Sequence, residues 1–176
     1  GETANHLVLL AETNDGFRNL IKLVSAGYTE GFYYRPRIDK ELLAEHRSGL
    51  IGLSSCLKGE VASGLRADQD RRALEAAATY RDILGKDNFF LEMQFQGIED
   101  QKKVNAGLVP IARELDLPLV CTNDVHYLQQ NQATAHEALL CIQTQTTLND
   151  PNRMRLKTDE FYFKTPEEMK QAFSYC

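Results

Sequence analysis

The sequence lacks any long apolar run, since no stretch approaches the roughly 20 apolar residues that a membrane-spanning helix needs. It shows no N-terminal signal peptide. Its four cysteines (Cys56, Cys121, Cys141 and Cys176) form no C-x-x-C pair and no framework of the kind found in small secreted proteins. These absences exclude a membrane protein and a disulfide scaffold. They favour a protein of the reducing cytoplasm, whose thiols are free to ligate a metal.

An excess of positive charge is also absent. Lys and Arg number 20 against 25 Asp and Glu, which gives a net charge of -5. This balance argues against a surface that binds nucleic acid as a whole, but it leaves room for a local groove. There is no internal repeat, low-complexity tract or evident linker. What remains is a chain of 176 residues, 43% hydrophobic and 26% charged, which is typical of a globular protein with one core.

Strand patterns and helix patterns alternate along the chain. The expected strands are 6–11, 49–53, 88–94, 117–120 and a short one at 161–163. The expected helices are 14–27, 39–46, 57–65, 70–84 (stopped by Gly85), 100–115 (kinked or broken at Pro110), 132–143 and one capped by Thr165 and Glu168. The first of them is expected to present Phe17, Leu20, Ile21 and Val24 on one face. Repeated strand–helix units indicate an α/β fold with a parallel sheet or barrel.

An aspartate and a histidine stand two positions apart just after the apolar run 117–120. Side chains at i and i+2 of an extended segment point the same way, so Asp124 and His126 can address one point in space. The end of a strand is where α/β proteins build metal and catalytic sites. The simpler interpretation is an Asp-capped turn with a solvent-facing His.

Cys56 follows the strand at 49–53 in the same way. If all strands leave at one rim, its thiolate can meet Asp124 and His126, and the three form a ligand set suited to zinc or manganese. Cys56 is equally explained as a small buried hydrophobe. A Cys–His nucleophilic pair is a further alternative, although no oxyanion hole is visible. Glu92 lies within the expected strand 88–94 and could point at the same rim. A helix-start cap or a core salt bridge explains it equally well.

The other polar signals are weaker. His136 is expected to be a hydrogen-bonded core histidine, because it shares a helix face with apolar residues. Arg35 and Arg37 lie beside two tyrosines and are candidates for holding a phosphate backbone while a ring stacks on a base. A surface loop with aromatics tucked under it is the simpler interpretation there. The basic run at 153–157 is more typical of a solvated face.

Six segments, taken in order, resemble one known family. They are NHL (5–7), GFYYRPRID (31–39), SCLKGE (55–60), TNDVHY (122–127), HEALLCIQT (136–144) and TDEFYFK (158–164). Together they look like the PHP (polymerase and histidinol phosphatase) domain found in the α subunit of bacterial DNA polymerase III. The resemblance covers nearly the whole chain, and the segments are long enough to make it specific.

The resemblance implies part of a distorted (β/α)7 barrel, similar to a TIM barrel, with Zn²⁺ or Mn²⁺ at the rim. The family's metal ligands fall on His6, Cys56, Asp124 and His126, all of them ligand-competent types. It also implies metal-dependent 3′–5′ exonuclease proofreading at a primer end, with Asp124 and His126 catalytic. The family's remaining ligands and N-terminal strands precede this sequence, and its polymerase domains follow it. Residues 1–176 are therefore expected to be the C-terminal portion of one PHP domain.

The implied whole protein is a DNA-directed DNA polymerase of DNA replication, with DNA and other replicase subunits as partners. The barrel of the isolated chain is expected to have an open edge, and the chain is expected to hold metal weakly or not at all and to be inactive. Two alternatives stay open. One is a non-catalytic module that supports the polymerase. The other is a metal phosphoesterase of the same superfamily that acts on a small phosphate.

Overall fold

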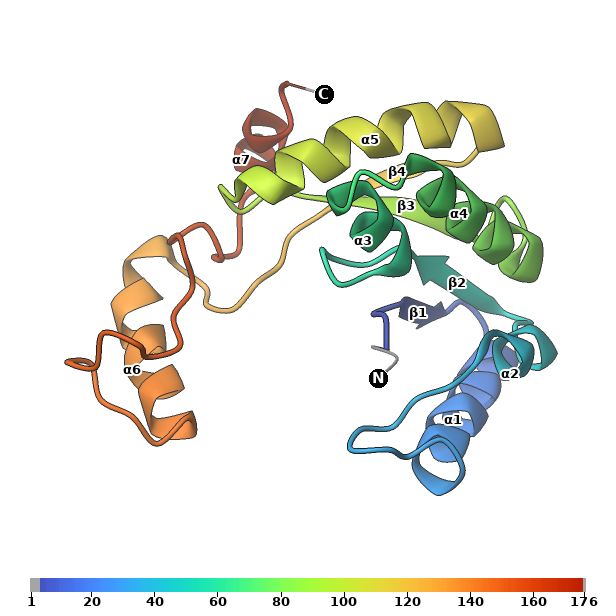
Figure 1. Cartoon of the computed structure of the whole chain (residues 1–176). Coiled ribbons are helices and arrows are strands. Elements are labelled where there is room, and N and C mark those ends of the chain that lie inside the picture. The colour runs from blue at the N-terminus through green and yellow to red at the C-terminus, as the bar shows by residue number, and fades with distance from the viewer. Residues whose placement is uncertain (1–3, 176) are drawn as a thin grey trace. The chain divides into compact units, whose positions relative to one another are not determined.

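The strands form one open, mixed sheet. In the computed structural model, which describes residues 4–175, the sheet has four strands in the order β1-β2-β3-β4 (Figure 1). They are β1 (Val8–Ala11), β2 (Leu50–Leu53), β3 (Phe89–Gln94) and β4 (Leu119–Thr122). β1 runs antiparallel to β2, whereas β2 and β3 are parallel. The α/β class is confirmed, and the expectation of an all-parallel sheet is wrong at β1.

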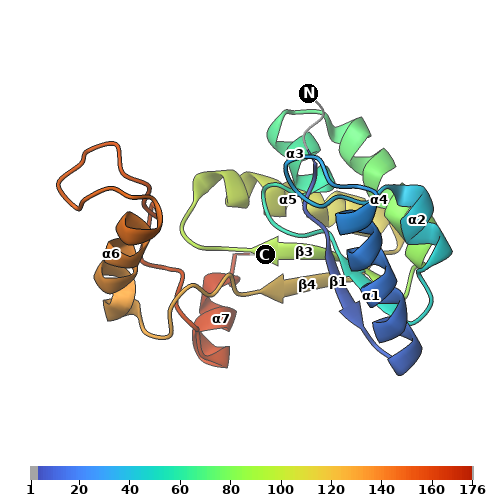
Figure 2. The same ribbon diagram turned by 90° about the horizontal axis from the view of Figure 1, so that it is seen from below.

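Helices connect the strands and cover them. They are α1 (Asn14–Thr29), α2 (Lys40–Glu45), α3 (Glu60–Arg66), α4 (Asp70–Leu84), α5 (Glu99–Leu115), the 3-10 turn η1 (Gln130–Gln132), α6 (Ala133–Gln143) and α7 (Pro166–Ala172). α1 packs on β1 and β2, and it runs beside β1 in Figure 2. α4 packs on α3 and β2. No helix within residues 4–175 combines the length and the apolar character that crossing a membrane requires.

The chain divides into two compact units. The first contains the residues up to Glu92 together with Ala106–Val120, and the second contains Met93–Asn105 together with the chain from Cys121 onward. β1, β2 and α1 to α4 belong to the first unit, whereas α6 and α7 belong to the second. Each unit is described by itself below.

The core of the first unit is built from the sheet and the helices above it. Leu50, Phe89 and Leu91 of the strands are fully buried, as is Ala73 of α4. α3 and α4 approach closely at Gly64, where an added Cβ would lie 3.0 Å from the Cβ of Ala73. A side chain at Gly64 would therefore require Ala73 to shift slightly.

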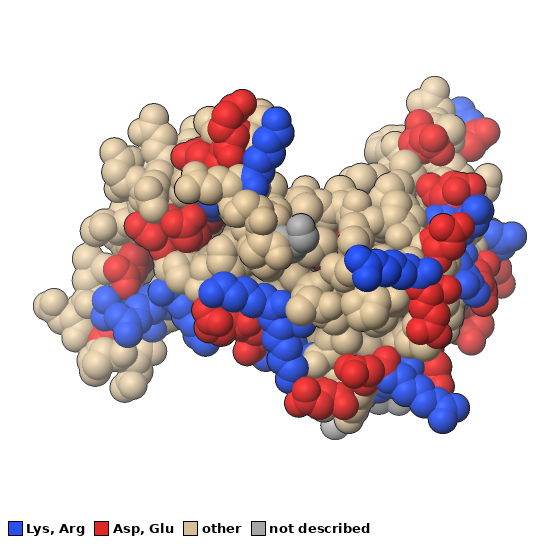
Figure 3. Space-filling model, turned by 90° about the horizontal axis from the view of Figure 1, so that it is seen from above, with Lys and Arg blue, Asp and Glu red and all other residues tan. Residues whose placement is uncertain are grey.

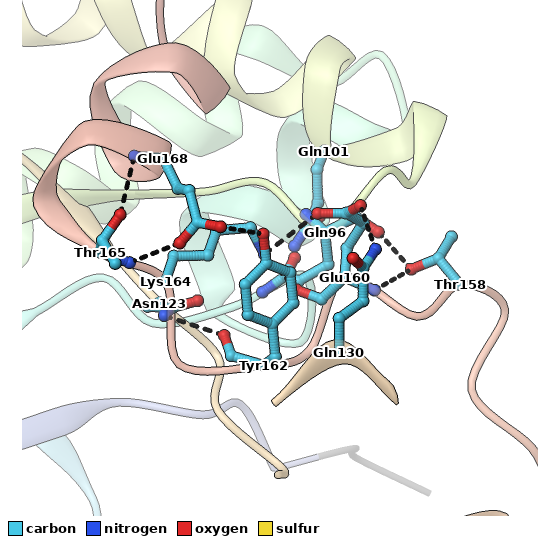
Figure 4. A network of polar contacts seen from close by, with 10 residues as sticks. All are labelled: Gln96, Gln101, Asn123, Gln130, Thr158, Glu160, Tyr162, Lys164, Thr165 and Glu168. Atoms are coloured by element: carbon cyan, nitrogen blue, oxygen red, sulfur yellow. Dashed lines mark hydrogen bonds and ion pairs between the residues drawn. The ribbon is translucent and has the colours of Figure 1, made fainter. Parts of the chain in front are cut away.

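Polar contacts hold the second unit together (Figure 4). The Thr158 hydroxyl donates to the carbonyl of Gln96 at 2.5 Å, and the Asn123 amide donates to the carbonyl of Tyr162 at 3.1 Å. The Tyr162 hydroxyl donates to Glu168 at 3.0 Å. The segment after Thr158 is therefore tied both to the chain that leaves β3 and to the chain that leaves β4.

Local capping signals were predicted correctly. Asp39 accepts a hydrogen bond from the amide of Leu42 at 2.8 Å and caps α2. Gly85 ends α4 with a φ of 94°, a conformation that costs glycine little. Thr165 and Glu168 form the expected capping box at the start of α7.

Two expected helix boundaries, an expected helix break and an expected strand are wrong. α1 continues past Gly27 to Thr29, because Gly27 is a buried packing position of the helix. α3 begins only at Glu60, since a turn closed by the Gly59 amide and the Cys56 carbonyl at 2.8 Å precedes it. α5 continues through Pro110 as one helix, so the expected break is absent, and the alternative of a kink there stays a prediction. The segment 161–163 forms only an isolated bridge, between Tyr162 and Tyr127.

α1 packs through a different face from the one expected. Its buried residues are Gly16, Leu23 and Gly27. Phe17 and Val24 are 57% and 54% exposed. Glycine lets the helix approach its neighbours closely: a Cβ on Gly16 would lie 1.8 Å from the Gly49 carbonyl oxygen. The buried face of the helix therefore consists of two glycines and one leucine, and Phe17, Ile21 and Val24 stay exposed.

Candidate functional site

Cys56 and His6 meet in the first unit. β2 leads into a turn in which Ser55 has a φ of 67°, and the His6 amide donates to the Lys58 carbonyl at 3.0 Å. These contacts place Cys56 Sγ 3.6 Å from His6 Nδ1, although the residues are 50 positions apart. Glu60, just after the turn, accepts hydrogen bonds from Lys40 of α2 and from a tyrosine of α4. Neighbouring helices thus hold the Cys56 turn in place.

Asp124 and His126 meet in the second unit, just after β4. The His126 amide donates to the Phe161 carbonyl at 2.8 Å, which fixes the backbone. His126 Nδ1 lies 3.7 Å from Asp124 Oδ1 and 3.2 Å from the Asp124 carbonyl oxygen. Both side chains are a little over one third exposed. The two side chains lie close together, and their roles as metal ligands and catalytic groups stay predictions.

Aromatic rings surround His126. The ring of Phe161 lies 5.1 Å from it and the ring of His136 lies 5.6 Å from it, measured between centroids. His136 also lies 5.4 Å from the Tyr127 ring. Burial lowers the pKa of His136, and nearby His126 lowers it further. His136 is half-buried, and Leu139 on the same helix is 63% exposed, so the expected core histidine is instead a neighbour of His126.

The two pairs belong to different units, His6 and Cys56 to the first and Asp124 and His126 to the second. Within either unit, over residues 4–175, no third His, Cys, Asp or Glu completes a group able to hold a metal ion. Each unit thus supplies two ligand-type side chains. The convergence of all four at one rim stays a prediction.

The geometry of the Cys56 and His6 pair fits a shared metal ion. Two ligands of a tetrahedral zinc ion, with sulfur at about 2.3 Å and nitrogen at about 2.0–2.1 Å, stand roughly 3.6 Å apart. Cys56 Sγ and His6 Nδ1 have this separation, at 3.6 Å. When Nδ1 of His126 carries its proton it donates to the Asp124 carbonyl, as metal-binding histidines commonly do, and Nε2 is left available.

The loop that contains Arg35 and Arg37 does not have aromatic rings tucked under it, contrary to the simpler interpretation of the sequence. Tyr33 and Tyr34 are 64% and 84% exposed, so they are not tucked under the loop. The Arg37 guanidinium stacks over the Tyr33 ring at 5.0 Å. Lys and Arg are interspersed with Asp and Glu on the face drawn in Figure 3, in keeping with the net charge. A nucleic-acid contact at this loop stays a prediction.

Comparison of the sequence with models of protein families shows to which family the chain belongs. The family model for the PHP domain matches residues 1–96, which is more than half of the sequence. The chain belongs to the PHP domain family. The matched region includes His6 and Cys56. The predicted extent of the domain, from residue 1 to residue 176, stays a prediction beyond residue 96.

Curated relatives of this PHP chain are similar over nearly all of its length. It is 48% identical to the DNA polymerase III subunit alpha of Treponema pallidum over 175 residues, which is 99% of this chain and 15% of that protein. The corresponding subunits of Deinococcus radiodurans and Thermus aquaticus are 49% and 50% identical over 95% and 94% of the chain. These matches cover only 12% and 13% of those proteins. The chain is thus homologous to the PHP portion of DNA polymerase III alpha subunits, and it spans a small part of their length.

Sequence reasoning missed a pocket in the second unit. The basic run at 153–157 folds back along α6 and, with Tyr127 and His136, lines an open pocket of about 450 Å³. The periodicity of apolar residues does not reveal such a pocket, because the pocket forms only where the loop after α6 packs back against that helix. The one local indication of a pocket in the sequence was that Tyr127 directly follows His126.

Proposed function

We propose that this PHP chain is part of a DNA polymerase III alpha subunit and serves DNA-directed DNA synthesis during replication. Identity near 48% over almost the whole chain supports this proposal. The groups that add nucleotides would lie in other parts of that subunit. The partners would be DNA and further replicase subunits.

Within such a subunit, His6, Cys56, Asp124 and His126 would be ligands of a metal-dependent 3′–5′ exonuclease. The observation that carries this proposal is the 3.6 Å separation of Cys56 Sγ and His6 Nδ1, the spacing expected of two ligands on one zinc ion. A bound zinc or manganese ion lowers the pKa of a ligated water and stabilises charge on a phosphate.

The protein groups would divide the work as follows. Cys56, as a thiolate, and the His6 imidazole would bind as terminal ligands from the first unit. Asp124 supplies an anionic oxygen, and its carbonyl orients the His126 ring through the 3.2 Å contact with Nδ1. The Phe161 carbonyl holds the His126 amide at 2.8 Å and fixes the backbone from which both side chains project.

A non-catalytic module that supports the polymerase is the second candidate. One observation favours it: within each unit, over the described chain, only two ligand-type side chains meet. A structural zinc site usually has four protein ligands and a catalytic one three. The phosphoesterase alternative is less well supported, because the relatives named above are all polymerase subunits.

Replacement of Asp124 by Asn in the full-length polymerase tests the exonuclease. The substitution keeps the size of the side chain but removes the anionic oxygen. Exonuclease activity at a mismatched 3′ end should fall by at least about a hundredfold, the upper range of losses seen even for outer-shell changes. Nucleotide addition should remain.

The control is Asp82→Asn, which neutralises an exposed carboxylate of α4 outside both pairs. It should leave both activities unchanged. Circular dichroism and the melting temperature establish that each variant is folded. If the folded Asp124→Asn polymerase keeps its exonuclease activity, the catalytic proposal is wrong and the supporting module takes its place.

A further inference from the structure

The loop between α1 and α2 carries three consecutive aromatic side chains, and all of them are exposed. Residues 32–37 of this loop are termed the aromatic loop, which joins the two helices within the first unit (Figure 1). Phe32, Tyr33 and Tyr34 are 56%, 64% and 84% exposed, although the burial of an aromatic ring is strongly favourable. A contiguous group of exposed rings is more typical of a binding surface than of a solvated turn.

Backbone contacts hold the aromatic loop in one conformation. The Tyr33 amide donates to the Arg35 carbonyl at 3.1 Å and closes a tight turn around Tyr34. The chain that leaves the turn packs closely against the chain that enters it, since a Cβ on Gly31 would lie 1.9 Å from the Arg37 carbonyl oxygen. The exposed rings therefore project from an ordered backbone, so binding to them would require little further ordering of the chain.

Tyr34 lies at the tip of the turn in a strained backbone conformation, with a φ of 59°. This left-handed region is rarely adopted by a bulky residue, whereas glycine enters it without strain. The strain is not offset by burial, because the ring of Tyr34 is mostly exposed and makes an edge contact with the Tyr33 ring at 4.6 Å between centroids. Strained residues are concentrated at functional sites, so a tyrosine at this position indicates a contact with another molecule.

The charge of the aromatic loop is positive and is not balanced by neighbouring carboxylates. The loop contains two arginines and no acidic residue, and the flanking acids are Glu30 and Asp39. Arg35 is exposed and forms no ion pair within residues 4–175. The Arg37 guanidinium stacks over the Tyr33 ring at 5.0 Å, which holds that ring in place. The loop therefore presents a cation beside exposed aromatic rings.

We propose that the aromatic loop binds single-stranded DNA, with a base stacked on the Tyr34 ring and the Arg35 guanidinium on a phosphate. Proteins that bind single strands combine aromatic rings, on which the bases stack, with cations that contact the backbone. Arg37 has a different task, since its contact with Tyr33 orders the loop itself. The choice of DNA rests on the proposed function, whereas the rings and the charge would serve RNA equally well.

A single strand matches the aromatic loop better than a duplex or a protein partner does. A single strand offers an anionic phosphate beside each accessible base, which fits a ring and a guanidinium on adjacent residues. A duplex offers the phosphates but keeps its bases paired and stacked. Tyrosine and arginine also dominate protein interfaces, but a protein would need an acidic patch placed opposite Arg35. A protein partner is therefore the alternative if no strand binds.

Fluorescence anisotropy of a labelled oligodeoxythymidylate of about 12 nucleotides tests the loop, since single-strand-binding domains cover roughly 4–16 nucleotides. The 176-residue chain is titrated at low salt with a chelator present, so the result does not depend on the proposed metal site. We expect the single strand to bind at least about tenfold more tightly than a duplex of the same length, because only the strand can stack on the ring. Tighter binding of an oligouridylate would overturn the choice of DNA.

Variants at the tip of the turn locate the binding. Tyr34→Gly removes the ring and also relieves the left-handed strain, so the fold should be retained. Affinity for the strand should fall roughly five- to a hundredfold, as for the loss of one stacked base. Tyr34→Phe keeps the ring and should restore most of the affinity. Arg35→Gln should lower the slope of log affinity against log salt concentration by about 0.7, the value for one phosphate of a single strand.

Matched controls make similar changes away from the aromatic loop. Phe163→Ala removes a ring that is 66% exposed in the second unit, and Arg71→Gln removes an exposed arginine that Glu75 already pairs at 2.9 Å. Neither control should change the affinity, and melting temperatures establish that each variant is folded. The inference is overturned if the wild-type chain binds the single strand no better than the duplex, or if folded Tyr34→Gly binds the strand as well as the wild type does.

Discussion

Glu168 and Tyr162 shift each other's titration across a 3.0 Å hydrogen bond. The Thr165 amide and hydroxyl, followed by the Tyr162 hydroxyl, hold the pKa of Glu168 below its usual value. Burial, followed by the bond to Glu168, raises the pKa of Tyr162 to about 12. A carboxyl group whose pKa is lowered by folding stabilises the folded chain at pH values above its pKa in the unfolded chain. This stability is lost as the pH falls through its pKa in the folded chain. A raised phenol pKa stabilises the fold below pH 10.0, and this stability is lost as pH rises toward about 12.

Replacement of Glu168 by Gln should therefore lower the melting temperature at pH 7, because a charged cap of α7 is lost. The gap between wild type and variant should close as the pH falls through the lowered pKa of Glu168, where the wild-type carboxylate also takes up a proton. Thermal melts at several pH values between 3 and 7 measure the gap. Glu114→Gln, at an exposed position of α5, serves as control and should show no such gap. A gap that persists unchanged at pH 3 would contradict the assignment.

His6 gives the sharpest residue-scale test of the proposed metal site. In the full-length polymerase, His6→Ala should lower the affinity for zinc or manganese at least about tenfold, since even outer-shell changes cost that much. His46→Ala removes a histidine that belongs to neither pair and should retain the metal. Elemental analysis after dialysis measures both. Equal metal content in the two variants would remove His6 from the ligand set.

How far the site was predictable depends on the separation of its residues. Asp124 and His126 are two positions apart, so strand geometry alone brings them together. Cys56 and His6 are 50 positions apart and meet only because β1 pairs with β2. Their pairing was implied by the family resemblance and not by spacing. His136 was misjudged, because the ring it contacts lies on another segment.

At the scale of elements, the close contact of α3 and α4 can be tested at Gly64. Alanine in place of a helical glycine gains up to about 1 kcal/mol from helix propensity. Here the new Cβ would lie 3.0 Å from the Cβ of Ala73 and 3.1 Å from its backbone nitrogen. We expect Gly64→Ala to be net destabilising and Gly64→Val to cost about 1–3 kcal/mol, as other overpacked sites do.

Urea unfolding measures this cost. The control, Ser25→Val on the exposed side of α1, introduces the same side chain into a helix without a close neighbour and should cost well under about 1 kcal/mol. If Gly64→Val is no more destabilising than the control, the two helices have more room than the structure gives them.

Caps were the most predictable features among the elements, because each depends on a few adjacent residues. Asp39, Gly85 and Thr165 are examples. The direction of β1 was not predictable, since a four-residue apolar pattern identifies a strand without giving its orientation. The buried face of α1 was predicted wrongly. Gly16 and Gly27 allow close packing because they are small, and a search for periodic apolar residues does not detect glycine.

At the scale of the whole chain, two pairs of ligands in two units predict weak metal binding. The 176-residue chain should retain well under one equivalent of zinc or manganese after dialysis, because a partial ligand set loses most of the coordination energy. If the proposed function is right, the full-length protein should retain zinc or manganese under the same conditions. Elemental analysis of both proteins makes the comparison. Stoichiometric metal on the short chain would show that the four residues suffice.

From the pairing of β1 with β2 we also predict an order of folding in the first unit. α3 and α4 meet across the short link 67–69, so their contact is local and forms early. β1 reaches β2 only after the long loop that contains α1 and α2 has closed, which costs more chain entropy. His6 therefore arrives beside Cys56 late. The rate at which the Cys56 thiol reacts with a labelling reagent during refolding should then report when β1 joins the sheet.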